Sequence, residues 1–131
     1  MKPTLFMPLA LLSLTGCGPD ETVSGFADPN ATYVLATIDD IAFAANATIS
    51  FTAEGSVSGS GPCNTFNATQ SVPYPWFELG PIASTRRACP DLALESDYFA
   101  ALATMRFAEV LGDTLILTGE DGGPLMVFQA E

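Results

Sequence analysis

Residues 55–67 read Gly55-Ser56-Val57-Ser58-Gly59-Ser60-Gly61-Pro62-Cys63-Asn64-Thr65-Phe66-Asn67. Glu54-Gly55 predicts a hairpin turn, and residues 56–60 predict the strand that returns from it. This strand has few large side chains, so another part of the chain is expected to pack closely against it. Asn64 is expected to turn or cap the chain through its own side chain. The stretch therefore indicates β architecture and no particular reaction.

Strand patterns lie on both sides of this stretch. They predict strands at 33–38, 48–53 and 56–60, then near 68–72, and at 76–79, 106–110, 114–118 and 125–128. One helix is expected at about 96–104, because Tyr98, Leu102 and Met105 share a helical face. The predicted fold class is α+β, a small antiparallel, partly open (cracked) β-barrel of six to eight strands with one helix.

The N-terminus reads as an export signal. Residues 1–16 carry one charge, Lys2, and an apolar stretch, and are expected to be a lipoprotein signal peptide. Leu14-Thr15-Gly16-Cys17 resembles the lipobox of bacterial lipoproteins, in which the cysteine after the cleavage site carries diacylglycerol. Lipidation of Cys17 would hold the chain on a membrane. The alternative is an ordinary signal peptide followed by a chance cysteine.

The predicted organisation after cleavage is an anchor, a tether and one domain. Residues 17–30 are rich in Gly, Pro and Asp and predict a lipidated cysteine with a flexible tether. Residues 31–131 are expected to form the domain. Gly18, rather than Asp, follows the cysteine, which favours the outer membrane facing the periplasm as the location within the bacterial cell envelope.

Charge and composition exclude several classes of function. The chain from Cys17 onward has three arginines, Arg86, Arg87 and Arg106, against 15 acids, so its formal charge is −12. Nucleic acid is therefore not an expected partner, since phosphate contacts need a basic surface. The absence of histidine excludes His-based triads and imidazole ligands. No cofactor or metal is predicted.

Cys63 and Cys89 are the two remaining cysteines. In an oxidising compartment a disulfide between them is expected, and it would stabilise the domain by about 3 kcal/mol. Two buried thiols are the next alternative. A redox pair is less favoured because no Cys-x-x-Cys occurs, and a zinc site is less favoured without histidine.

Five motifs in order resemble one family over residues 31–130. They are Tyr33-Val34-Leu35, Gly61-Pro62-Cys63-Asn64-Thr65-Phe66, Thr85-Arg86-Arg87-Ala88-Cys89, Tyr98-Phe99-Ala100-Ala101-Leu102, and the closing strands Leu115-Ile116-Leu117 and Leu125-Met126-Val127-Phe128. This order is similar to the META domain, the HslJ-type domain of bacterial heat-inducible and lipoprotein chains. The matched motif residues are Gly61, Cys63, Asn64, Phe66, Thr85, Arg86, Ala88 and Cys89. Pro62 and Tyr33 depart from the family pattern.

The resemblance implies a cracked barrel similar to that of type III secretion pilot lipoproteins. It also implies links to heat induction, drug tolerance, motility and secretion. The family carries no established catalytic residues, so the resemblance assigns none here.

Two charged features remain as candidate sites. Two acidic pairs, Asp39-Asp40 and Glu120-Asp121, lie at predicted turns. A third group lies at the start of the predicted helix and consists of Asp91, Glu95 and Asp97. Acids in such places usually solvate a turn or complement a helix N-terminus. Arg86-Arg87 is the only basic cluster after Cys17, and one of the two is expected to pair with a carboxylate. The functional hypothesis for this pair is a site that binds an anion or docks a partner.

The expected function is that of a non-enzymatic envelope lipoprotein, with a stress-related or interaction module held at the membrane by lipid on Cys17. Its partner would be an envelope protein. The alternatives are a periplasmic carrier of a small apolar ligand and a pilot-type lipoprotein for a secretion component. The carrier hypothesis rests on the aromatic residues and on apolar residues on both faces of the closing strands.

Overall fold

A computed structural model describes Pro3 and residues 18–131 of the chain. Cys17, the predicted lipidation site, and all of the predicted signal peptide except Pro3 lie outside the described residues. Within the described part, no helix has both the length and the apolar character needed to cross a bilayer.

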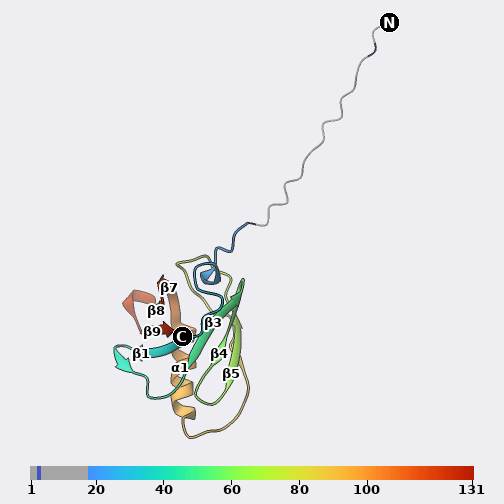
Figure 1. Cartoon of the computed structure of the whole chain (residues 1–131). Coiled ribbons are helices and arrows are strands. Elements are labelled where there is room, and N and C mark those ends of the chain that lie inside the picture. The colour runs from blue at the N-terminus through green and yellow to red at the C-terminus, as the bar shows by residue number, and fades with distance from the viewer. Residues whose placement is uncertain (1–2, 4–17) are drawn as a thin grey trace.

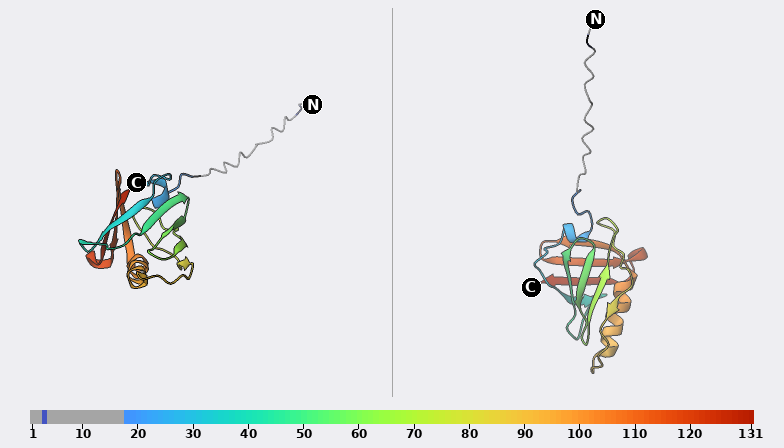
Figure 2. Two further views of the ribbon diagram at one scale, coloured as in Figure 1. Left: turned by 60° about the horizontal axis from the view of Figure 1, so that its bottom comes forward. Right: turned by 90° about the vertical axis from the view of Figure 1, so that its right-hand side faces the viewer.

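The domain is built on one antiparallel sheet that curls into a partly open barrel (Figure 1). Its strands are β1 (Tyr33–Ile38), β2 (Ile41–Ala42), β3 (Thr48–Ala53), β4 (Ser56–Ser60), β5 (Thr65–Thr69), β6 (Ala83–Ser84), β7 (Met105–Leu111), β8 (Thr114–Gly119) and β9 (Leu125–Ala130). The strand order is β6-β5-β4-β3-β1-β9-β8-β7, with β2 paired to β1. The right-hand view of Figure 2 shows β7, β8 and β9 crossing behind β3, β4 and β5.

Within residues 18–131, one α-helix, α1 (Leu92–Thr104), lies along one side of the curled sheet, and two short 3₁₀ turns, η1 (Val23–Gly25) and η2 (Glu120–Gly122), complete the element order. The predicted α+β cracked barrel with one helix is therefore confirmed.

Aromatic and aliphatic side chains fill the interior of the barrel. The largest fully buried ones include Tyr33, Phe51, Phe66, Phe77, Tyr98 and Phe128. Tyr98 comes from α1, and its hydroxyl donates to the Thr48 carbonyl at 2.8 Å. Burial raises the pKa of this phenol, so it stays a neutral donor.

The close approach expected at residues 56–60 occurs at Gly59. A Cβ there would lie 2.1 Å from the carbonyl oxygen of Thr48 and 2.8 Å from the Phe66 ring. No side chain fits at that distance, which explains why this position of the strand is a glycine.

Residues 70–80 bridge the opening between β5 and β7. The Gly80 amide donates to the Thr69 carbonyl, and the Phe77 amide donates to the Arg106 carbonyl, both at 2.8 Å. The predicted strand at 76–79 is wrong in form, because this segment makes only isolated bridges, Trp76 to Phe107 and Gln70 to Leu79. The neighbouring Pro73 and Pro75 lack the amides that a continuous ladder needs.

Two other element boundaries differ from the prediction. The strand expected near 68–72 is β5, which begins at Thr65, directly after Asn64. The helix expected at 96 begins at Leu92, with Asp91 in the N-cap position but without a side-chain capping bond. Ser96 lies inside the helix, where its hydroxyl donates to the Leu92 carbonyl.

The predicted flexible tether is wrong for residues 20–30. Val23 in η1 is 1% exposed and belongs to the core. The Asp20 carboxylate accepts bonds from the Thr22 amide and from the hydroxyls of Thr22 and Ser24, which fixes this turn. The Tyr74 amide donates to the Glu21 carbonyl at 2.7 Å. The packed unit therefore begins at about residue 20 rather than at 31.

Candidate functional site

A buried polar network joins α1 to the loop after β4. Glu95, in the first turn of α1, is 4% exposed. Its Oε2 accepts the backbone amides of Cys63 at 2.8 Å and Asn64 at 2.7 Å, and its Oε1 accepts Asn64 Nδ2 at 2.6 Å. The carboxylate thus receives three hydrogen bonds from two adjacent residues of one loop.

Asn64 connects this carboxylate to the segment before the helix. Its Nδ2 also donates to the Arg87 carbonyl at 3.0 Å. Its Oδ1 accepts the Arg87 amide at 2.6 Å and the Thr85 hydroxyl at 3.0 Å. Both donors and both acceptor sites of the amide are used, so Asn64 fixes residues 85–87 rather than only capping its own turn.

Hydrogen bonding keeps Glu95 ionised. Burial by itself raises the pKa of Glu95, but the bonds from the Asn64 side chain and from the amides of Cys63 and Asn64 outweigh burial and lower the pKa below its ordinary value. A buried carboxylate held in this way is a structural group rather than a proton donor at neutral pH.

The predicted disulfide is confirmed. Cys63 and Cys89 are bonded, with their Cα atoms 5.7 Å apart. The bridge ties the loop containing Asn64 to the residues just before α1. The disulfide and the Asn64 side chain therefore hold residues 85–89, and Glu95 in turn holds Cys63 and Asn64.

A surface groove of about 380 Å³ borders this network. Its lining comes from the segment before the helix and from one face of α1: Asn64, Ser84, Thr85, Arg86, Arg87, Ala88, Leu92, Glu95, Ser96 and Phe99. We call it the arginine groove. Arg86 and Arg87 are both exposed. The prediction that one of them pairs with a carboxylate is wrong, because neither forms an ion pair within residues 18–131.

The structure brings most of the predicted motif residues together around this groove. Thr85, Arg86 and Ala88 line it, and Gly61 lies directly under Glu95, where a Cβ would come within 2.7 Å of Oε2. Phe66 lies apart, buried in the core against Tyr98 and Phe99.

Glu95 was expected to be one of several acids at a helix start, and its role in the network was not predicted. A signal was present, because Glu95, Tyr98 and Leu102 are spaced to share one helical face and all three are buried. A charged residue in that position needs a buried partner.

The other acidic pairs serve turns. Asp39 and Asp40 adopt positive φ between β1 and β2, and the Asp39 carboxylate accepts the Leu125 amide at 2.8 Å. Asp121 also has positive φ, within η2. Among the described residues, no group of three or more Cys, Asp or Glu side chains is arranged to hold a metal ion.

Comparisons with known proteins agree with this fold. A family model described as the META domain matches residues 24–131. A solution structure of a protein from Burkholderia xenovorans matches with a TM-score of 0.62 and 20% identity, over 95% of this chain and 99% of that one. No curated protein matches the sequence.

A second similar structure belongs to a DUF4847 family protein from Bacteroides vulgatus, with a TM-score of 0.54 and 19% identity. That match covers 63% of this chain and 57% of the other, so the chain spans a little over half of that protein's length. These likenesses concern the fold.

Proposed function

The chain belongs to the META-domain family, and on that premise we propose that it is a bacterial envelope lipoprotein, anchored through Cys17, whose domain acts by binding a partner rather than by catalysis. The binding face is the arginine groove, and the partner is an acidic segment of another envelope protein. A secretion component docked by a pilot-type lipoprotein would be one member of this class.

One observation carries the proposal: within residues 18–131, the two exposed guanidinium groups have no carboxylate partner, and they lie on a segment fixed by hydrogen bonds and a disulfide in an otherwise acidic domain. Arg86 and Arg87 supply two of the three positive charges of residues 17–131. The side-chain amide of Asn64 and the Cys63–Cys89 bridge fix the backbone beneath them. Arginine suits such a role because its planar donors bind carboxylates in pairs.

The acidity of the domain restricts the docking position. A chain with a formal charge of −12 repels an acidic partner over most of its surface. Docking of an acidic segment is therefore expected only where the arginines lie. This restriction would fix the orientation of the partner even if the electrostatic contact is weak.

The packed interior gives the carrier hypothesis less support. Tyr33, Phe51 and Phe128 occupy the space that a ligand would need inside the barrel. Small barrels are usually filled by side chains in this way.

The anchor is tested by growing cells with a clickable fatty acid. The wild-type chain should incorporate the label and the C17A variant should not. A C17A chain that incorporates the label as well as the wild type would exclude this anchor.

The binding face is tested by a photocrosslinking amino acid at Ser96, which lines the groove, with Asp113 in the β7–β8 turn as the matched control position. Crosslinks to one envelope protein should form from position 96, fail from position 113, and disappear in the R86E/R87E variant. Equal crosslinking from both positions, or crosslinks that survive the charge reversal, would contradict docking at the arginine groove.

A further inference from the structure

We propose that the end of the domain around Tyr74 lies in the interface of a lipid bilayer. We call this end, formed by Phe26, Tyr74, Trp76 and Leu111, the aromatic end. The inference rests on the proposed anchoring at Cys17 and adds to it an orientation and a second membrane contact.

The exposed apolar side chains are concentrated at this end. Five large hydrophobic side chains of the described residues are exposed, and three of them belong to the aromatic end: Phe26 (53%), Trp76 (54%) and Leu111 (54%). Phe26 stacks on the half-buried Tyr74 ring with centroids 4.2 Å apart. The Tyr74 hydroxyl accepts the amide of Val110, next to Leu111, at 3.0 Å.

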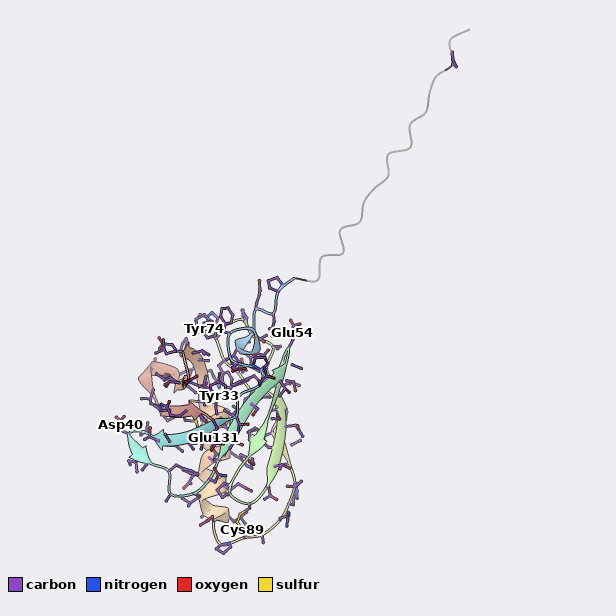
Figure 3. All side chains as sticks on the ribbon, viewed as in Figure 1. Tyr33, Asp40, Glu54, Tyr74, Cys89 and Glu131 are labelled. Carbon is purple, nitrogen blue, oxygen red and sulfur yellow. A yellow bond between two sulfur atoms is a disulfide. The ribbon has the colours of Figure 1, made fainter. Side chains whose placement is uncertain are left out.

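The chain that leads to Cys17 leaves from the same end. The Tyr74 amide is bonded to the Glu21 carbonyl, and Figure 3 shows Tyr74 and Glu54 where the N-terminal segment leaves the domain. The bond from the Val110 amide to the Tyr74 hydroxyl brings the last residues of β7, which ends at Leu111, to this same end of the domain. Cys89 lies at the opposite end (Figure 3).

The free length between anchor and domain is very short. Asp20 is already held by its bonds to Thr22 and Ser24. Only three residue steps separate Asp20 from Cys17, which span at most about 11 Å. A lipid on Cys17 would therefore hold the aromatic end at the depth of the headgroups rather than let the domain move freely above them.

The chemistry of the aromatic end fits a neutral bilayer interface. Tryptophan and tyrosine favour the headgroup region, where an apolar ring and a polar group are both satisfied. Glu21 and Glu54 are exposed beside the exit of the chain, so attraction to anionic lipid does not contribute. The contact would depend on apolar burial and on the covalent anchor.

Trp76 is the only tryptophan, so its fluorescence reports on this surface alone. With Cys63 and Cys89 bridged, Cys17 is the only free thiol of residues 17–131 and can be coupled to a maleimide lipid. The coupled protein is incorporated into phosphatidylcholine vesicles whose acyl chains carry bromine. Flotation of the vesicles measures the anchor, and quenching of Trp76 measures the contact.

Trp76 emission should be quenched in the brominated vesicles and should move to shorter wavelength. Replacing Phe26 and Leu111 with serine removes two of the four apolar contacts and should lower the quenching by a factor of about two. The control is I41S, which removes an exposed side chain on β2, beside Asp40 and away from Tyr74 (Figure 3), and should leave the quenching unchanged.

Protein that floats with the vesicles while Trp76 stays unquenched would overturn the membrane contact. Shielding of Trp76 by solubilised envelope protein, but not by lipid, would overturn it in favour of a protein surface. Because the lipid is attached chemically, these results do not depend on whether cells lipidate Cys17. The fatty-acid labelling described above tests that separately.

Discussion

At the scale of single residues, the domain depends on one asparagine and one glutamate. Asn64 uses all of its side-chain hydrogen-bonding capacity, and Glu95 accepts three bonds while almost fully buried. Local sequence reasoning assigned the turn role of Asn64, but its bonds to residues 85, 87 and 95 cross long distances in the chain. No local pattern encodes such contacts.

Replacing Glu95 with glutamine should destabilise the fold. Both oxygens of this carboxylate accept hydrogen bonds from N–H groups. The side-chain NH₂ of glutamine would replace one of these oxygens and would face an N–H group that it cannot bond. The free energy of unfolding should fall by about 1.5–3 kcal/mol, as measured by urea denaturation. The control is D97N, which removes an exposed charge from the same helix and should change the stability little.

The same carboxylate gives the stability a pH dependence. The pKa of Glu95 is lower in the folded state than in the unfolded chain, whose ordinary value is 4.5. The stabilisation is therefore present above pH 4.5 and is lost as the pH falls through the lower folded-state pKa. Urea midpoints of the wild type and of E95Q should converge as the pH is lowered below 4.5. A constant difference between them would contradict this assignment.

At the scale of elements, the disulfide and the Glu95 network hold the same loop. Replacing Cys63 and Cys89 with serine should lower the free energy of unfolding by about 3 kcal/mol, because the unfolded chain gains freedom. Urea denaturation of the wild type with reductant should give the same loss. Reductant should have no effect on the double variant, and a further loss there would show that the bridge is not the group affected.

The η1 turn is a second element whose importance local sequence does not reveal. Val23 is fully buried, so V23A should lower the free energy of unfolding, up to about 1.5–3 kcal/mol, the range for burying such a side chain. Thermal or urea unfolding measures this. F26A, which truncates an exposed neighbour, is the control and should have a much smaller effect. Equal losses would mean that η1 is not part of the core.

At the scale of the whole molecule, the architecture was predictable where apolar and polar residues alternate regularly along the strands of a hairpin. The bounds of β1, β3 and β4 agree with the predicted strands at 33–38, 48–53 and 56–60. The prediction was wrong where tertiary contacts override composition. Residues 20–30 have the composition of a loop, yet one valine and the bonds of Asp20 attach them to the barrel.

The candidate site was only partly predictable for a related reason. The motif residues predicted the loop that contains Cys63 and Asn64 as well as the correct cysteine pair, and the resemblance identified the family. Glu95 was missed because an acid near a helix start is ordinarily a surface residue. Its burial follows from the position of a loop that is 31 residues away in the sequence.

The molecule also has two distinct ends. The aromatic end lies beside the exit toward Cys17, and Cys89 lies at the far end, near the arginine groove (Figure 3). If the aromatic end rests on a membrane, the groove faces away from it and is free to meet a partner.

The position of β1 also bears on when the domain can form during synthesis. β1 lies between β3 and β9, with Tyr33 opposite Ala130, so the seam between the two halves of the sheet needs the last strand of the chain. A nascent chain can form the β3–β4 hairpin on the ribosome, but the seam closes only once residues 125–130 have emerged. If the chain is exported as proposed, a seam that stays open until β9 has been made would leave the preceding residues able to pass unfolded through a narrow channel.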